Sequence, residues 1–258
     1  MHHFFLNPDD IHDLQVIFPD QVAHQIKHVL RLAKGDRVAV LDNRGAIYTV
    51  VLRDETAKGQ WIGDIVRTQM ATSEPRVQIS LFIGLSSREK MEWIFQKGTE
   101  IGVSAFCPFV SSRTLVSNTG LTEGKMSRWK RIIQEAAEQS GRGKLPVLNA
   151  PEKLADCFRN AIQTNGLCLL AWEGLPAGGV NLKEALRGFT GDKLALFVGP
   201  EGGFSDEEVA SAQGAGCQLV TLGARIFRME TAAVVFPALA LHELGSEQVQ
   251  IHMRHRSR

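Results

Sequence analysis

Two loops rich in glycine and charge hold the residues most able to do chemistry. The first, GPEGGFSDEE at 199–208, follows the apolar run Leu194–Val198 and has glycines on both sides of Glu201. Glycine has no Cβ, so the backbone amides and carbonyls of such a loop can approach a ligand closely. Ser205 and Glu208 have the spacing of a capping box, which predicts a helix that starts at Ser205.

The residues of this first loop limit the kind of ligand that it can bind. It lacks both the Gly-Lys-Ser/Thr of a phosphate-binding loop and the G-x-G-x-x-G of a dinucleotide site. Acidic residues at the helix start occupy amides that a phosphate would need. A cationic or zwitterionic ligand therefore fits better. Considered alone, the loop is explained equally well as a structural strand-to-helix turn.

The second loop, LGARIFRMET at 222–231, also follows an apolar run. Its charged side chains, Arg225, Arg228 and Glu230, precede a segment that is almost wholly apolar. Charged side chains beside a buried helix destabilise the folded state unless they are paired with opposite charges or take part in function. They are therefore either a structural Arg–Glu pair or functional groups.

The apolar segment after this loop predicts a buried helix over 231–244. Thr231 is placed to cap its start, and Pro237 inside it is expected to kink or offset it.

Basic residues form a third feature, around the segment QEAAEQSGRGKLP at 134–146. Taken singly, each is explained by a solvated helix face. Basic groups on two domains can also grip a phosphate backbone between them, which predicts salt-dependent RNA binding. The residues are Lys125, Arg128, Lys130, Arg131, Arg142 and Lys144, with Arg31, Lys34, Arg37 and Arg44 nearer the N-terminus.

Composition sets the limits on class. The 258 residues are 44% hydrophobic, with a formal net charge of +1, so a globally basic nucleic-acid binder is excluded. The four cysteines form no C-x-x-C pair, which disfavours zinc and disulfide scaffolds and favours buried, reduced thiols. No apolar run is long enough for a membrane span, and the first residues lack the layout of a signal peptide.

Two regions must position these loops. Residues 1–72 have the pattern of short strands with one helix at 20–32, which is typical of a small β-barrel. Residues 69–77 are predicted to form a linker. Beyond it, five buried strands alternate with helices, which predicts an α/β domain with a mostly parallel sheet. Ligands of such sheets bind outside the carboxyl ends of the strands. Both glycine loops, and LAWEGLPAGG at 170–179, follow such ends.

Four motifs together carry a family resemblance. In order, QKGTEIGV, EAAEQSGRGKLP, GPEGGFSDEEV and LGARIFRMETAA closely resemble the RsmE-like family of 16S rRNA (uracil-N3)-methyltransferases, of the SPOUT superfamily of S-adenosylmethionine-dependent enzymes. The likeness covers essentially the whole chain, because HHFFL and HVLRLAKGD resemble that family's PUA-like RNA-binding barrel. Phe227 departs from the smaller aliphatic residue that is common in the family.

The resemblance implies an architecture that the residues alone do not. It implies a PUA-like β-barrel at 1–72, a SPOUT domain at 73–245 with a trefoil knot over roughly 194–245, and a basic tail at 246–258. It also implies a cytoplasmic homodimer with the apolar helix at the interface, acting without a metal on 16S rRNA within the small ribosomal subunit.

By the same resemblance, S-adenosylmethionine would bind between the loops, with Glu201 organising its loop. The implied cofactor residues are Leu170, Ala171, Glu173, Val198, Gly199, Pro200, Glu201, Gly202, Gly203, Leu222, Gly223, Ile226, Phe227, Met229 and Thr231. The expected RNA contacts are Arg31, Lys34, Lys97, Arg113, Gln139, Arg142 and Arg225.

Methylation at uracil N3 requires help with the loss of its proton. Arg228 is expected to stabilise the developing anion, and Glu230 to act as base or to orient that arginine. The alternatives are a ribose methyltransferase of tRNA or rRNA on the same fold, and a non-catalytic RNA-binding module. A nucleotide-dependent oxidoreductase is disfavoured because the dinucleotide fingerprint is missing.

Overall fold

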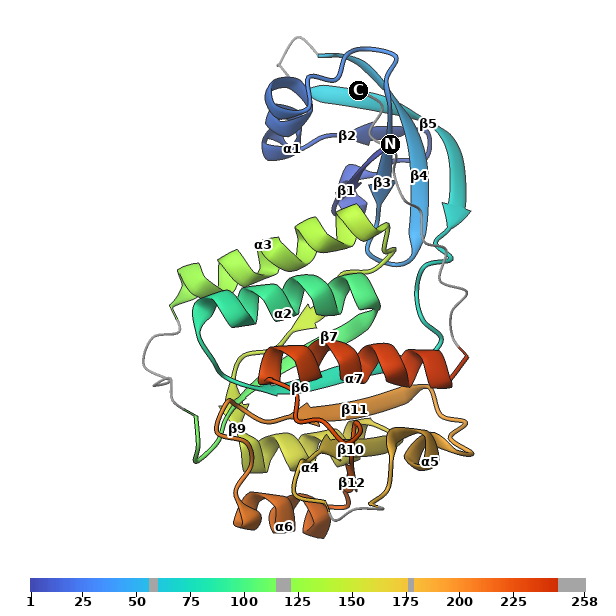
Figure 1. Ribbon diagram of the computed structural model, residues 1–258. Helices are drawn as coiled ribbons and strands as arrows, with labels where there is room; N and C mark the ends of the chain where they lie inside the picture. The colour runs from blue at the N-terminus through green and yellow to red at the C-terminus, as the bar shows by residue number, and fades with distance from the viewer. Residues whose placement is uncertain (56–59, 115–121, 176–178, 246–258) are drawn as a thin grey trace. The chain divides into compact units, whose positions relative to one another are not determined.

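The computed structural model describes residues 1–55, 60–114, 122–175 and 179–245 (Figure 1). Contacts between Cα atoms divide the chain into two compact units. The first comprises Met1–Glu74, Ser87–Phe106 and Val116–Asn149, and the second Pro75–Ser86, Cys107–Leu115 and Ala150–Arg258. The units follow proximity in space and not order along the chain, so the domains 1–72 and 73–245 stay predictions about the sequence.

The first unit contains a five-stranded sheet in the order β1-β3-β4-β5-β2. Strand β1 is parallel to β3, whereas β3–β4, β4–β5 and β2–β5 are antiparallel. The strands predicted at the N-terminus are all present, and the short β2 was not predicted. Their bounds are β1 His2–Phe5, β2 Gln15–Ile17, β3 Arg37–Leu41, β4 Ala46–Glu55 and β5 Trp61–Met70.

The β3–β4 hairpin shows why its turn residues are needed. Asn43 and Gly45 both have positive φ, 58° and 108°, which these residue types tolerate. The Asp42 carboxylate accepts hydrogen bonds from the Arg44 and Ala46 amides at 2.8 and 3.0 Å. The predicted strand, turn and strand are therefore confirmed.

Helices of the first unit follow the predicted periodicity. The short 3-10 turn Pro8–Asp10 precedes β2, and the helix expected at 20–32 consists of α1 (Asp20–His24) and the π-helical turn η2 (Gln25–Val29). Helix α2 (Arg88–Ile101) packs on α3 (Glu123–Ser140). A Cβ on Gly98 of α2 would lie 2.7 Å from the Phe106 ring, so glycine permits this close packing.

The second sheet has the order β12-β10-β11-β6-β7-β8, with β9 beside β7. Strand β10 pairs in parallel with β11 and β12, β11 with β6, and β7 with β8 and β9. The mostly parallel sheet of five main strands is confirmed, and the two-residue strands β8 and β9 were not predicted. The bounds are β6 Gln78–Gly84, β7 Val103–Val110, β8 Val147–Leu148, β9 Glu152–Lys153, β10 Leu167–Ala171, β11 Lys193–Val198 and β12 Gln218–Val220.

Helices on both faces bury the strands of the second unit (Figure 1). Ala195 and Phe197 of β11 share a core with residues of α4 (Leu154–Thr164) and α6 (Asp206–Ala215). Helix α7 (Met229–Glu243) contacts β6 and β11, and the short α5 (Leu182–Leu186) contacts α7. Burial on two faces explains why these strands are almost continuously apolar. All four cysteines are free, and Cys157, Cys168 and Cys217 are buried.

Helix α7 corrects one expectation. It begins at Met229, and the position before its first residue is Arg228, so Thr231 lies within the first turn and does not cap the helix. The amide of Ala232 already bonds to the Arg228 carbonyl at 2.9 Å, which fixes the earlier start. Pro237 lies inside the helix. Within the described ranges, no helix has both the length and the apolarity that crossing a membrane requires.

Candidate active site

Three loops of the second unit share one edge of its sheet. Strands β10, β11 and β12 are parallel neighbours and end at Ala171, Val198 and Val220, so the segments after them all leave from the carboxyl edge. The Trp172 amide donates to the Val220 carbonyl at 3.1 Å, which joins the ends of β10 and β12. Leu170 and Val198 are buried, so a ligand at this edge meets mainly the segments beyond them.

The loop after β11 folds as a tight turn that glycine makes possible. The Gly203 amide donates to the Pro200 carbonyl at 2.9 Å, and Gly203 has φ +69°. A Cβ on Gly203 would lie 2.9 Å from a carboxylate oxygen of Glu173, so the side chain of the β10 loop rests on this backbone. The predicted capping box is confirmed: Glu208 N donates to Ser205 Oγ at 3.2 Å, and Ser205 N donates to the Glu208 carboxylate at 3.0 Å.

The end of β6 supports the same loop from the other side. A Cβ on Gly84 would lie 2.5 Å from the Pro200 nitrogen, so only glycine allows this approach. The Ser86 hydroxyl donates a hydrogen bond to the Glu201 carboxylate. Glu201 was expected to organise its loop, and this bond joins its side chain to the segment after β6. Sequence reasoning missed Gly84 and Ser86, although a glycine at the carboxyl end of a buried strand was a usable signal.

Arg113 fastens the loop through its backbone. Its Nη1 donates to the carbonyls of Gly202 and Phe204, both at 3.1 Å. Gly202 is needed at this contact, since a Cβ there would lie 3.0 Å from the Cβ of Arg113. The neighbouring Ser112 amide donates to the Glu208 carboxylate at 2.8 Å, so the capping box also binds the segment after β7. Arg113 was expected to contact RNA, and in this structure its guanidinium holds the glycine loop.

The second predicted loop presents charge and apolar surface outward. Arg225 and Arg228 are exposed, and Ile226 is 81% exposed although it is a large apolar side chain. Leu222 and Phe227 are half-buried, whereas Met229 is buried. Gly223 has φ +118°, and its Cβ position has no neighbouring atom within 4 Å, which leaves room for a ligand against the backbone. Glu230 lies in the first turn of α7 with its Oε2 atom buried.

The charges at this edge favour a cationic group. The carboxylates of Glu173 and Glu201 both lie beside the glycine turn, and both residues are exposed. Residues 199, 202 and 203 have no side chains, so the loop backbone can lie against Phe204, Arg113 and Glu173. Such a site suits a zwitterionic ligand with a positive centre better than a phosphate. Among the described residues, no group of three His, Cys, Asp or Glu side chains is placed to hold a metal ion.

The remaining residues expected to contact RNA, apart from Arg225, lie in the first unit. Arg31, Lys34 and Gln139 are exposed, and Arg31 has φ +54°. Lys97 is half-buried and forms an ion pair with Glu100 at 2.9 Å.

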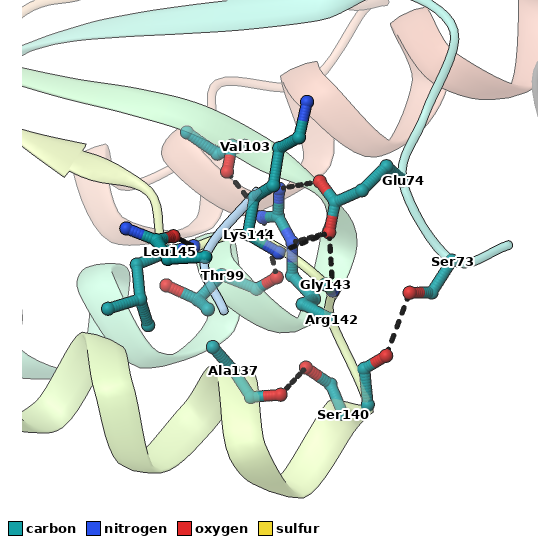
Figure 2. Close-up of polar contacts among 12 residues, drawn as sticks. Ser73, Glu74, Thr99, Val103, Ala137, Ser140, Arg142, Gly143, Lys144 and Leu145 are labelled. Atoms are coloured by element: carbon teal, nitrogen blue, oxygen red, sulfur yellow. Dashed lines mark hydrogen bonds and ion pairs between the residues drawn. The ribbon is translucent and has the colours of Figure 1, made fainter. Parts of the chain in front are cut away.

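Arg142 differs from these residues because it is only 3% exposed. Figure 2 shows its guanidinium turned into the protein, toward the Glu74 carboxylate and two backbone carbonyls. The Nη2–Oε2 distance to Glu74 is 2.8 Å, and Nη1 donates to Thr99 O at 3.2 Å and to Val103 O at 2.5 Å. These bonds use the donors that a phosphate would need, so Arg142 has a structural role in this structure.

Comparison with known proteins gives the family. Residues 72–241 match the family described as "RNA methyltransferase domain", and residues 18–60 match "RNA methyltransferase PUA domain". Ribosomal RNA small subunit methyltransferase E of Synechocystis sp. is 34% identical over 241 residues, which cover 93% of this chain and 75% of that protein.

Two solved structures have a similar fold. One is a putative methyltransferase from Legionella pneumophila in complex with S-adenosylmethionine, with a TM-score of 0.81 and 26% identity over 93% of this chain and 96% of that one. The other is Ribosomal RNA small subunit methyltransferase E from Neisseria gonorrhoeae bound to S-adenosylmethionine, with a TM-score of 0.79 and 27% identity over 93% of this chain and 96% of that one. Together with the glycine loops at one sheet edge, these matches show that the chain belongs to the RNA methyltransferase family that includes the Ribosomal RNA small subunit methyltransferase E proteins.

Proposed function

We propose that this protein methylates N3 of a uridine in 16S rRNA of the small ribosomal subunit, with S-adenosylmethionine as methyl donor. One observation carries the proposal: the glycine turn at 199–203 lies at the carboxyl edge of the sheet, held by Glu173, Ser86 and Arg113. The same relatives that share this fold are named for rRNA methylation or were solved with the cofactor.

The residues at this edge fit S-adenosylmethionine. The cofactor carries a sulfonium and an ammonium group, and exposed carboxylates of Glu173 and Glu201 stand beside the glycine turn. Open space at Gly223 and the apolar side chains of Leu222 and Phe227 suit its adenine and ribose. When bound, the cofactor supplies an electrophilic methyl group. The other cofactor residues expected from the sequence belong to these same loops or to the adjoining strand ends and the first turn of α7.

The start of α7 supplies the groups for the uracil. Removal of the N3 proton leaves negative charge on the uracil oxygens, which positive charge stabilises. Arg228 is exposed just before the first residue of α7, where the unpaired amides of the helix also favour negative charge. Glu230, in the first turn, serves as the proton acceptor or orients that arginine.

Several finer features belong to the same proposal. We infer a trefoil knot over roughly 194–245 and closure of the N-terminal sheet as a PUA-like barrel, on the resemblance of the sequence motifs. We also infer a cytoplasmic homodimer that acts on the small ribosomal subunit. In the second unit, the apolar helix α7, whose Leu239 is 40% exposed, supports an interface on this helix.

Mass spectrometry of 16S rRNA tests the reaction. We expect rRNA from a strain that lacks this protein to lose one methyluridine, and the purified protein with S-adenosylmethionine to restore it on small subunits from that strain. Fragmentation of the nucleoside distinguishes the alternatives. A methyl group at N3 of the base supports the proposal, and a methyl group at another base position or on the ribose, or no missing methylation, contradicts it.

The role of Arg228 is testable with Arg228→Ala. We expect kcat to fall about a hundred- to a thousandfold at saturating cofactor and RNA, because stabilisation of the developing anion is lost. Arg187→Ala, which changes an exposed arginine at the end of α5, is the matched control. Wild-type turnover by Arg228→Ala would remove the electrostatic assignment.

A further inference from the structure

The loop 141–145, which follows α3, is held more firmly than the proposed chemistry requires. Glu74 accepts two bonds from Arg142 and further bonds from the amides of Gly143 and Lys144, at 2.9 and 3.1 Å (Figure 2). Burying such an ion pair adds little net stability, because desolvation offsets the attraction. Its clear effect here is to fix the position of the loop.

Further contacts fasten this loop to the five-stranded sheet of the same unit. The Ser73 hydroxyl donates to the Gly141 carbonyl at 2.7 Å, and the Leu145 amide donates to Asn43 Oδ1 at 2.7 Å. A Cβ on Gly143 would lie 2.4 Å from the Cβ of Ala71, so the backbones meet where only glycine fits. Residues 141–144, GRGK, therefore form one rigid side of the surface beside the end of β5, which we call the wall.

A groove of about 410 Å³ lies between this wall and the sheet. Its volume is within the range of small-molecule sites, about 300–1,000 Å³. Apolar and hydrogen-bonding side chains both line it. The lining residues are Ile47, Gln69, Met70, Thr72, Ser73 and Gly141. Met70 is 67% exposed, so a large apolar side chain faces solvent here.

Positive charge borders the groove. The Cε atom of Lys144 lies 3.7 Å, and that of Met70 3.4 Å, from the Cβ position of Gly45, so the lysine side chain lies close to the groove. Arg44, next to Gly45 in the hairpin turn, is exposed. The carboxylates of Asp42 and Glu74 are engaged by backbone amides, and Glu74 also by Arg142. The positive charges of Lys144 and Arg44 beside the groove thus complement the negative charge of a polyanion.

We propose that this groove, which we call the β5–α3 groove, binds one unpaired nucleotide of the RNA substrate. The base lies against Met70 and Ile47, Gln69 and Thr72 bond its edge, and Lys144 neutralises a neighbouring phosphate. Apolar faces with adaptable polar groups and a nearby cation are the features that recognise single-stranded RNA. The inference rests on the proposed function and adds a subsite outside the methyl-transfer site.

Two pairs of variants test it. Thr72→Trp fills the groove, and Thr68→Trp places the same side chain at an exposed position within β5. Lys144→Ala removes the border charge, and Lys193→Ala removes an exposed charge at the start of β11 in the second unit. The readouts are the dissociation constant for transcribed 16S rRNA at several salt concentrations, the dissociation constant for S-adenosylmethionine, and Tm.

We expect Thr72→Trp to weaken RNA binding about tenfold, as the loss of one stacked base does. Lys144→Ala should weaken it and lower the salt slope by about one. Both controls should bind RNA like wild type, and all four variants should keep cofactor affinity. Equal RNA affinity for Thr72→Trp and Thr68→Trp overturns the inference, and so does a change of oligomeric state in Thr72→Trp alone, which would assign the groove to a protein partner.

Crosslinking keeps the inference testable if Thr72→Trp lowers Tm. The wild-type protein is irradiated with a 16S transcript that contains 4-thiouridine, and the modified peptides are identified by mass spectrometry. Crosslinks within 69–73 support the groove, and crosslinks confined to other segments overturn it. Methylation of small subunits by the wild-type protein is measured in parallel. If it fails, the proposed function fails, and if it succeeds while the groove variants bind normally, only this inference fails.

Discussion

Arg113 and Arg142 both carry donors that an RNA phosphate accepts, and both sit in basic or loop segments of the sequence. In the structure, Arg113 donates to the carbonyls of Gly202 and Phe204, and Arg142 to Glu74, Thr99 and Val103. Guanidinium groups suit this work because their donors have a fixed, planar geometry. The same geometry serves phosphate binding, so residue type alone does not distinguish the two roles.

The two hydrogen bonds by which Arg113 clamps the glycine loop give a prediction at the residue scale. Arg113→Ala frees the glycine loop, and we expect the affinity for S-adenosylmethionine to fall about fivefold, equivalent to about 1 kcal/mol for the lost hydrogen bonds. Arg113→Lys keeps the charge but cannot reproduce the planar donor geometry, so we expect it to be nearly as weak. Calorimetric titration with the cofactor measures both variants.

Arg159→Ala, on the exposed face of α4, is the control for the loss of one positive charge. RNA affinity is measured on the same proteins. An unchanged cofactor affinity in Arg113→Ala, together with weaker RNA binding, would contradict the clamp and restore the original expectation that Arg113 contacts RNA.

At the scale of elements, α2 and α3 are joined by packing and by a charge cluster. Phe95 of α2 contacts Trp129 of α3 edge to face, with ring centroids 5.0 Å apart. On the surface, Glu92 of α2 accepts bonds from Arg128 of α3 at 2.5 and 2.9 Å, and from Arg88 at 2.7 Å. Helical periodicity predicted both helices, but this link between them depends on their arrangement in space.

This cluster predicts a pH dependence of stability. The hydrogen bond from Arg128 is the main cause that lowers the pKa of Glu92 from 4.5 to about 2. A carboxyl whose pKa is lower in the folded state adds stability above its unfolded pKa. That contribution is lost as pH falls from about 4.5 to 2. Because the cluster is largely at the surface, we expect it to contribute about 1 kcal/mol or less.

Thermal unfolding of wild type and Glu92→Gln between pH 2 and 7 measures the effect. We expect Tm of the variant to be lower at pH 7 and to approach that of wild type below pH 3. Glu123→Gln, at the exposed start of α3, controls for the loss of a carboxylate. A constant difference in Tm across the whole range would show that Glu92 acts through packing and not through ionisation.

At the scale of the whole molecule, contacts between Cα atoms place α2 and α3 in the same compact unit as the five-stranded sheet. Most of the parallel sheet belongs to the other unit. The second unit retains the strands β6, β10, β11 and β12, whose carboxyl ends bear the candidate site. Helix α7 packs on β6 and β11 in that unit, yet Leu239 on it is 40% exposed.

The proposed dimer predicts the effect of a charge on α7. Leu239→Glu should convert the protein to a monomer, because a carboxylate in an apolar interface loses its hydration without gaining a partner. Light scattering coupled to size-exclusion chromatography measures the mass. Ile162→Glu, on α4, changes a residue of similar exposure, 38%, and should leave the mass unchanged. A wild-type protein that is already monomeric, or a variant that stays dimeric, contradicts an interface on this helix.

The sequence by itself determined the local structure. Nearly continuous apolar runs predicted the main strands of the parallel sheet, helical spacing predicted α2 and α3, and Asn43 and Gly45 predicted the β3–β4 turn. It also determined which loops are glycine-rich, and their order supplied the family resemblance. These features depend on neighbours along the chain, so a single sequence contains them. One boundary failed, since α7 starts before Thr231, because the cap depends on the path of the preceding loop.

Only the tertiary structure decided which groups contact Gly84, Arg113 and Arg142. Gly84 is needed only because Pro200 lies against it, Arg113 is a clamp only because residues 202–204 pass in front of it, and Arg142 is buried only because Glu74 meets it. The partners in these contacts lie 68 to 116 positions apart along the chain. Charge and size fix what a side chain can bind, whereas the packing of distant segments fixes what it does bind.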